Sequence, residues 1–240
     1  MFKKLFLLPL FFIILLHFNQ SSAHVLHYQN LNRLEFDLYR NNKLIGQHTY
    51  LFDKNGKNLT VHNKINFKIK VFGVTVYRYF SEGYEKYVNG KFESFSATTN
   101  HNNKEKYCKI YKKENKFFIE GSSYKGSAPE DFIIGTWWNH EIINYGFQIS
   151  AGSGRIIKQT VRFIGKETIQ INNKAYTALK FNFFSSDPSL SKDRKLNTNV
   201  WYDEKNLILL KTSFEKNGYW EYRLKYFDLN QWSYIFIFIL

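Results

Sequence analysis

The sequence predicts an all-β protein whose antiparallel strands follow one another as an up-and-down meander. Three observations carry this prediction: polar and apolar residues alternate with a period of two, asparagine or glycine pairs recur between the alternating segments, and those segments contain no proline. Such a meander forms a strongly curved sheet, a half-barrel or a barrel. We expect about ten to twelve strands with one short helix.

The first 23 residues have the organisation of a secretory signal peptide. Two lysines precede an apolar run over residues 5–16, and Ser-Ser-Ala at 21–23 supplies the small residues that a signal peptidase requires. The run is shorter than the ~20 residues that cross a bilayer as a helix. We therefore expect a cleaved signal peptide at 1–23, export to the periplasm, and a single β-rich domain at 24–240 without a transmembrane helix.

Two segments show the strand pattern most clearly. Over residues 64–71, lysine or asparagine alternates strictly with isoleucine, phenylalanine or valine. Over residues 220–226, tryptophan, tyrosine or leucine alternates with charged residues. Because successive side chains of a strand point to opposite faces, each segment presents one polar and one apolar face. Both segments therefore predict half-buried antiparallel strands.

Short turn signals separate the strand-length segments. Asparagine and glycine tolerate the positive φ that tight hairpin turns require. Such residues occur at Asn41-Asn42, Lys54-Asn55-Gly56, Asn89-Gly90, Glu114-Asn115, Asn172-Asn173, Lys205-Asn206 and Asn217-Gly218. Gly73 is different, because it lies inside a continuous strand pattern from Asn58 to Tyr79. There we expect a bulge or bend that curls the sheet.

Two segments depart from the alternating pattern. Residues 127–130, Ser-Ala-Pro-Glu, have the form of a capping box with proline at an early helical position, which predicts a short helix that covers one end of the sheet. The last nine residues, Trp232 to Leu240, are almost wholly apolar and too few to span a membrane as a helix. They fit a final buried strand or an exposed tail.

The charge balance is strongly basic but does not indicate a nucleic-acid partner. The chain has 34 lysines and arginines against 20 acids, a formal charge of +14, yet only 7 of those cations are arginine. Nucleic-acid recognition depends largely on arginine, whose planar fork grips phosphates and bases. The single cysteine, Cys108, cannot form an intrachain disulfide, and we expect it to be a small apolar residue on a strand.

No catalytic motif is present, so we name no catalytic residue and no cofactor. The sequence has no nucleophile elbow, no zinc-protease motif and no phosphate loop. One metal candidate remains. Cleavage after Ala23 would make His24 the N-terminus, where its amine and imidazole could chelate copper with His27 or a distant histidine.

The aromatic residues have two interpretations. They fill a large core, or a curved sheet rich in aromatics encloses a cavity for an apolar ligand. In the second case we expect the ligand to contact Trp137, Trp138, Trp201 and Tyr202. The lysine-rich segment 104–116 likewise fits either the solvated face of a hairpin or a peripheral contact with anionic lipid headgroups.

Several separated motifs occur in a fixed order along the chain. They are Gly46-x-His48, Tyr77-Arg78-Tyr79, Glu85, Asn89-Gly90, Trp138-Asn139, Gly165-x-Glu167, Trp201-Tyr202-Asp203 and the hairpin at Gly218. Together they resemble one family of secreted bacterial proteins, domain of unknown function 6134. The resemblance covers nearly the whole mature chain and implies an exported, β-rich protein without an assigned activity. The Trp-Tyr-Asp motif with its final hairpin also resembles half-barrel envelope proteins that carry lipids or lipoproteins.

These observations favour a non-catalytic envelope protein that binds an apolar or amphipathic ligand, such as a lipid, within a curved sheet. The alternative is a structural or assembly partner in the envelope that docks through strand edges or through the apolar tail.

Overall fold

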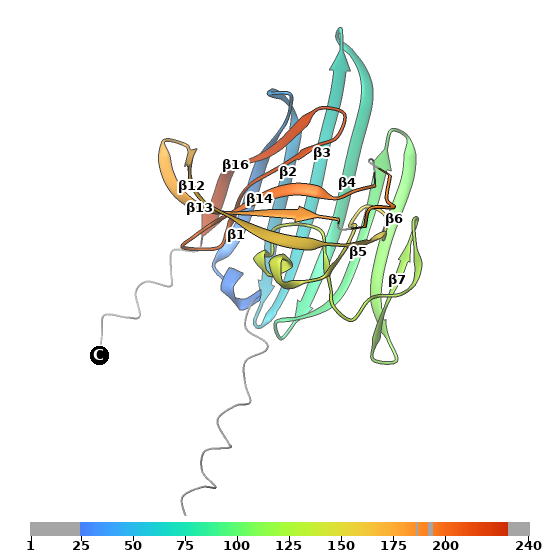
Figure 1. Cartoon of the computed structure of the whole chain (residues 1–240). Helices are drawn as coiled ribbons and strands as arrows, with labels where there is room; N and C mark the ends of the chain where they lie inside the picture. The colour runs from blue at the N-terminus through green and yellow to red at the C-terminus, as the bar shows by residue number, and fades with distance from the viewer. Residues whose placement is uncertain (1–24, 186, 192–193, 230–240) are drawn as a thin grey trace, which may run out of the picture.

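The computed structural model describes residues 25–185, 187–191 and 194–229 (Figure 1). The predictions for the signal peptide, for His24 and for a strand at Trp232 to Leu240 lie outside these residues. In the part of the chain that the structure covers, no helix is long and apolar enough to cross a membrane.

One sheet of 13 strands forms most of the molecule. Each strand pairs antiparallel with its neighbours, as the meander predicted. The order across the sheet is β12-β13-β14-β15-β16-β1-β2-β3-β4-β5-β6-β7-β8. The one long-range neighbour pair is β16 and β1, which joins the last described strand to the first.

The strands of this sheet have the following bounds: β1 (Leu31–Arg40), β2 (Lys43–Asn55), β3 (Asn58–Val71), β4 (Val74–Val88), β5 (Lys91–His101), β6 (Lys104–Lys113), β7 (Lys116–Gly121), β8 (Lys125–Ser127), β12 (Thr160–Ile171), β13 (Lys174–Phe184), β14 (Asn197–Asp203), β15 (Leu209–Glu215) and β16 (Tyr219–Leu229). The end strands β12 and β8 do not pair with each other, so the described sheet is curved but not closed.

A second, 3-stranded sheet lies between β8 and β12 in the sequence. It consists of β9 (Phe132–Ile134), β10 (Phe147–Ile149) and β11 (Ile156–Lys158), with β9 and β10 parallel. Two short 3-10 helices accompany the sheets, η2 (Val25–Tyr28) and η3 (His140–Asn144). Figure 1 shows strands β13 and β14 crossing in front of the long strands β2 to β4 of the same sheet.

All seven predicted turns join neighbouring strands of the large sheet. At Asn41-Asn42, Asn89-Gly90 and Asn172-Asn173, for example, both turn residues have positive φ. The structure adds a turn at Asn102-Asn103 and another at Phe72-Gly73.

The prediction of a bend at Gly73 was therefore wrong. Phe72 and Gly73 have φ values of 49° and 81°, and they form a two-residue turn between β3 and β4. The apolar alternation continues on both sides of this turn, and Phe72 is not a usual turn residue. Both features hide the hairpin in the sequence.

The predicted helix at residues 127–130 was also wrong. Ser127 ends β8, and the amide of Ala128 donates a hydrogen bond to the carbonyl of Phe117 at 2.8 Å. Residues 132–134, which follow this segment, form β9 and pair with β10. A capping box is a local preference, and sheet pairing with tertiary burial outweighs it here.

The number of strands also exceeds the expected ten to twelve, since the two sheets hold 13 and 3 strands. The additional strands come from the turns at Phe72-Gly73 and Asn102-Asn103, and from strands of three residues such as β8 to β11, which are too short to show a period of two.

Aromatic side chains fill the interior below the η3 segment. Trp138 is fully buried, and its ring makes edge contacts with Tyr28, Phe52 and Tyr87 at centroid distances of 5.1, 5.3 and 5.9 Å. A smaller apolar cluster around Cys108 and Ile110 packs β5 to β7 against the small sheet. In these parts of the molecule the aromatic interior is a packed core.

Candidate functional site

An open cavity of about 710 Å³ lies on one face of β12 to β16. Among its lining residues are Asn182 and Phe184 from β13, Thr198 from β14 and Phe214 from β15. The volume falls within the range of about 300–1,000 Å³ that is usual for small-molecule sites. This cavity is the candidate functional site.

One part of the cavity lining is apolar. Its members are Trp137, Phe184, Leu196, Phe214 and Tyr222. Phe214 on β15 lies against Tyr222 on the neighbouring strand β16, with a distance of 6.1 Å between the ring centroids. Side chains of this kind offer rigid apolar surface to an apolar chain.

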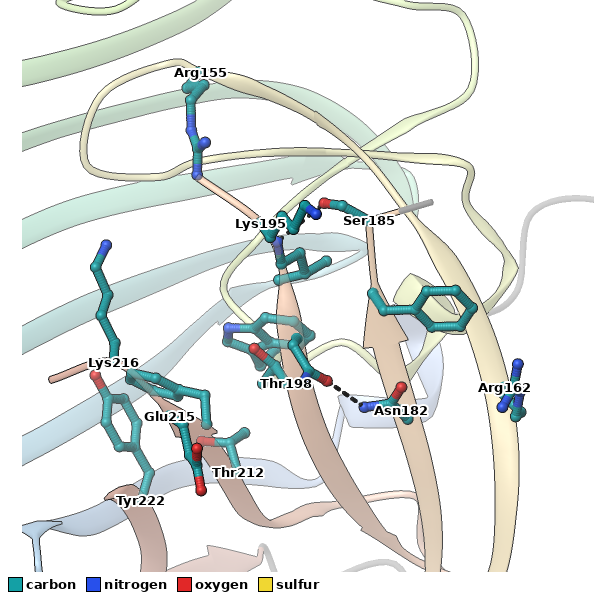
Figure 2. Close-up of a pocket in the computed structure, with 15 residues that line it drawn as sticks. Arg155, Arg162, Asn182, Ser185, Lys195, Thr198, Thr212, Glu215, Lys216 and Tyr222 are labelled. Atoms are coloured by element: carbon teal, nitrogen blue, oxygen red, sulfur yellow. Dashed lines mark hydrogen bonds between the residues drawn. The ribbon is translucent and has the colours of Figure 1, made fainter. Parts of the chain in front are cut away.

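The charged residues that line the cavity are almost all basic. Arg155, Arg162, Lys195 and Lys216 line the cavity, and Glu215 is the one carboxylate among the described lining residues. In Figure 2, Arg155, Lys216 and Arg162 lie at the periphery of the group, whereas Thr198 lies near its centre. Cations around an opening create a positive potential that attracts anions.

Several of these cations are held by nearby groups. A guanidinium nitrogen of Arg155 donates to the carbonyl of Arg194 at 3.1 Å. The guanidinium of Arg162 lies 5.3 Å from the ring centroid of Phe184, so it stacks on the apolar lining. A neutral contact also fixes the lining, since the side-chain amide of Asn182 donates a hydrogen bond to Asn197 at 3.0 Å, as the dashed line in Figure 2 shows.

Hydroxyl groups also line the cavity. Thr198 and Thr212 are buried, at 7% and 2% exposure. Tyr222 is a third hydroxyl residue of the lining, and burial raises its pKa, with Tyr79 and Tyr77 adding to the effect. The Tyr222 phenol therefore stays protonated at neutral pH and offers a hydrogen bond without a charge.

Trp137 enters the cavity lining from a loop with an unusual backbone. Its φ of 66° lies in the left-handed region, which is uncommon for a bulky residue. The phenol of Tyr202 donates to the Trp137 carbonyl at 2.8 Å, and the indole packs edge-on against Phe183 at 5.0 Å. These contacts hold a conformation that the isolated chain disfavours.

Glu85 holds the neighbouring residues of the same loop. This fully buried carboxylate accepts hydrogen bonds from the Trp138 indole at 2.9 Å, from the Thr136 hydroxyl at 3.1 Å and from the Tyr87 phenol. Burial raises the pKa of Glu85, and the three hydrogen bonds oppose that rise. Because Glu85 does not line the cavity, its role is to position the loop.

The four residues predicted to contact a ligand occupy three different environments. Trp137 lines the cavity. Trp138 and Tyr202 are buried in the core at 0% and 1% exposure. Trp201 lies three positions from the cavity residue Thr198 and so points to the opposite face of β14. There its ring lies between the ammonium groups of Lys180 and Lys211, at 4.8 and 4.9 Å, and its indole donates to Glu167.

Other candidate residues lie away from the cavity. Cys108 is buried on β6, as expected, and burial raises its pKa to about 12. The lysines of β6 and Lys116 at the start of β7 are mostly exposed, which agrees with a solvated hairpin face. Among the described residues, no three histidine, cysteine or acidic side chains gather as metal ligands would.

Sequence reasoning missed most of the cavity residues. Phe184, Phe214, Arg162 and Lys195 lie between 11 and 52 positions apart in the chain, and only the sheet order brings them together. The arginines were the available signal in the sequence. The chain has only seven arginines, and two of them, Arg155 and Arg162, line the cavity.

Comparisons with known proteins bear on the fold. A crystal structure of a beta-barrel-like protein of domain of unknown function DUF1849 from Brucella abortus matches with a TM-score of 0.54 and 13% identity, covering 83% of this chain and 98% of that one. A DUF1329 family protein from Desulfovibrio piger matches with a TM-score of 0.22 and 6% identity, over 88% and 95% of the two chains. No curated protein matches significantly.

The family assignment rests on a separate comparison. The model of the family described as domain of unknown function (DUF6134) matches residues 36–225, a range that holds every motif on which the resemblance was based. Two of those motif residues, Glu85 and Glu167, accept hydrogen bonds from the tryptophans of two others, so these motifs form polar contacts within the fold. The chain belongs to the DUF6134 family.

Proposed function

We propose that the protein is a non-catalytic binder of an anionic amphiphile, such as a fatty acid or an acidic lipid, in the cavity on β12 to β16. The observation that carries this proposal is the division of the cavity lining into an apolar part and a basic part. An apolar chain would lie along Phe184, Phe214 and Trp137, and its anionic end would lie near Arg162 and Lys195.

The two parts of the lining favour this ligand class for separate reasons. Burying an apolar chain gains roughly 25 cal/mol for each Å² removed from water. An anionic end gains charge-assisted hydrogen bonds from arginine and lysine. A wholly apolar ligand would leave the basic groups without a role, and a small anion would leave the aromatic lining exposed to water.

The packed core sets a limit on how the ligand binds. Trp138, Tyr28 and Tyr50 occupy the interior below the loop, all with at most 2% exposure, so an apolar chain cannot pass through the centre of the sheet. The ligand would therefore lie in the open cavity and stay partly accessible from one side. Such a site suits a carrier that takes up and releases its ligand.

The cell envelope is the proposed location. The predicted signal peptide at 1–23 supports export, and the periplasm is the compartment in which amphiphiles need a carrier between membranes. Fusion of residues 1–30 to a reporter that functions only after export provides a test. A reporter that stays inactive and intracellular would contradict this location.

Mass spectrometry of lipid extracts tests the ligand class. The protein should be purified from its native host without detergent, and we expect an anionic amphiphile at near-stoichiometric amounts. The double variant Arg162→Gln, Lys195→Gln should retain several-fold less of it, because two charge-assisted contacts are lost. The matched control Lys109→Gln, Lys112→Gln removes two exposed cations from β6 and should leave the ligand in place.

The experiment separates the ligand class from binding in general. If both double variants lose the ligand equally, the contact depends on overall charge and the cavity is not the site. If all forms are free of ligand, the binding proposal fails. If a neutral amphiphile is retained equally in all forms, the assignment of the basic side chains is wrong.

The open sheet supports a second candidate, a structural partner that docks through a strand edge. Strand β12 ends the sheet order and exposes Phe163 and Ile164 at 53% and 50%. An edge strand has unpaired backbone groups that can add a strand from another chain. Where the apolar tail is the docking element, removal of residues 232–240 distinguishes the two candidates. A ligand carrier without the tail should keep its ligand, whereas an assembly protein without the tail should lose its partner.

A further inference from the structure

The β3–β4 hairpin extends beyond both of its neighbours in the sheet. Pairing of β2 with β3 ends at Gly46 and Phe67, and pairing of β4 with β5 ends at Tyr79 and His101. In the strand ladders, residues 68–78 therefore pair only with each other, while the carbonyl of Arg78 accepts a hydrogen bond from the amide of Asn102 at 2.8 Å. Figure 1 shows this hairpin rising above the rest of the molecule. At about 3.3 Å per residue, the turn at Phe72 lies roughly 16 Å beyond Phe67.

The base of the hairpin is fixed to the core. Phe67 is buried at 6% exposure and stacks on Tyr77 and Tyr79 at centroid distances of 5.8 and 5.1 Å. Trp220 of β16 contacts the same ring edge-on at 5.3 Å. An anchored base makes the projecting part a defined feature of the surface.

The tip of the hairpin exposes apolar side chains to an unusual extent. Phe72 is fully exposed at 103%, and Val74, Val76 and Val71 are exposed at 65%, 50% and 47%. Leu44, on the neighbouring β1–β2 hairpin, is exposed at 59%. A group of exposed apolar residues indicates a contact surface rather than a random surface position.

The turn holds a phenylalanine in a backbone conformation that is unfavourable for this residue. Phe72 has a φ of 49°, a conformation that asparagine and glycine adopt more readily. The other two-residue turns of the described sheet place asparagine, glycine or glutamate at the corresponding position. The ring makes no contribution to the core, so its presence at this position points to a role outside the molecule.

The surroundings of the tip are basic and lack carboxylates. Residues 65–81 contain Lys68, Lys70 and Arg78 but no aspartate or glutamate. Lys68 lies directly opposite Arg78 in the ladder, a like-charge pair that is unfavourable by itself. A groove of about 1050 Å³ beside the hairpin adds Arg40 and Lys43, and none of its described lining residues is acidic.

We infer that the tip of the β3–β4 hairpin docks the protein on an anionic lipid bilayer. Phe72, Val71 and Val74 enter the interfacial region, while Lys70 and Lys68 meet the lipid phosphates. The spacing fits this arrangement, since Lys70 lies about 7 Å and Lys68 about 13 Å behind the tip, and interfacial segments typically insert by about 5–10 Å. The phosphates also neutralise the pair formed by Lys68 and Arg78.

Sedimentation with vesicles tests this inference without risk to the fold. The probe is vesicles of phosphatidylcholine with phosphatidylglycerol, compared with phosphatidylcholine alone. We expect wild-type protein to bind the anionic vesicles and Phe72→Asn to bind them at least about fivefold more weakly, because the main apolar contact is lost. Asparagine with the following glycine suits this turn, so the variant should fold normally.

Two further variants complete the test. Lys68→Gln with Lys70→Gln should weaken binding by roughly fivefold or more and reduce its dependence on phosphatidylglycerol. The control Phe163→Asn removes a half-exposed phenylalanine from edge strand β12 and should bind like wild type.

Three results would overturn the inference. The first is wild-type protein that does not bind anionic vesicles, and the second is Phe72→Asn that binds as well as wild type. The third is a dimer, seen by sedimentation velocity, that Phe72→Asn dissociates while vesicle binding persists, which would assign the tip to a second copy of the chain. Ligand content of the cavity is not involved, so these results are independent of the proposed function.

Discussion

Individual buried polar residues show how this fold satisfies polar groups inside an aromatic core. Glu85 accepts three hydrogen bonds, and the Nε2–H of His48 donates to Asn63 at 2.9 Å. Such groups cost free energy when unpaired, so each has a partner from another strand or loop. At this scale, the motifs that resemble the family are contacts between specific side chains.

His48 makes the stability of the protein depend on pH. Burial lowers its pKa from 6.5 to about 3, with the hydrogen bond to Asn63 acting in the opposite direction. Below pH 6.5 the unfolded chain takes up a proton that the folded protein does not, so the free energy of unfolding should fall as the pH drops towards 3. The expected slope from this group approaches about 1.4 kcal/mol per pH unit.

Urea denaturation between pH 7 and 4 measures this slope, and His48→Gln should reduce it. The same variant at pH 7, where the histidine is neutral in both states, gives the cost of replacement without titration. A slope that is unchanged in His48→Gln would show that other groups carry the acid sensitivity.

At the scale of elements, the sequence predicted turns better than it predicted the segments between them. The turns require positive φ at one or two residues. Asparagine and glycine favour this conformation, so the turns can be recognised from the local sequence. The hairpin at Phe72-Gly73 escaped notice because phenylalanine gives no such signal. The helix predicted at 127–130 failed because its residues find sheet partners that lie elsewhere in the chain.

For the candidate site, too, local sequence patterns predicted only part of what the structure shows. Trp137 was predicted to contact a ligand as one of the aromatic residues of a curved sheet, and it belongs to the cavity lining. Trp138 and Tyr202 face the core, and Trp201 lies on the other face of its strand. A bulge between Trp201 and Tyr202 shifts the pairing with β15, and no local pattern reveals such a shift.

The β3–β4 turn allows a direct measurement of the backbone cost at Phe72. Phe72→Asn should stabilise the protein by about 1 kcal/mol and raise the melting temperature by about 2–4 °C, because asparagine tolerates a φ of 49° better. The converse variant Asn89→Phe, at a turn residue with a φ of 51°, should destabilise by a similar amount. Thermal unfolding that shows no gain for Phe72→Asn would contradict this account.

The loop that carries Trp137 depends on tyrosine hydroxyl groups from the sheet. Tyr202→Phe removes the hydrogen bond to the Trp137 carbonyl and should reduce the free energy of unfolding by about 1–3 kcal/mol. The same change should weaken ligand retention, since Trp137 loses a contact that fixes its backbone. Tyr226→Phe, at a residue with 48% exposure, serves as the matched control for urea denaturation. Equal effects of the two changes would argue against this role for Tyr202.

At the scale of the whole molecule, a curved sheet is filled with aromatic side chains in one part and left open in another. The filled part explains how a chain with one cysteine reaches stability through packing alone. The open part combines an apolar lining with a basic one. The projecting hairpin adds a surface suited to a bilayer, the source from which an amphiphile would be drawn.

The most direct test of the central claim is a crystal structure of the protein purified from its native host without detergent. The account predicts elongated electron density along Phe184, Phe214 and Trp137, with a polar end within hydrogen-bonding distance of Arg162 or Lys195. A cavity that holds only water, in crystals of protein whose lipid extract is also empty, would contradict the proposal that the cavity binds an amphiphile.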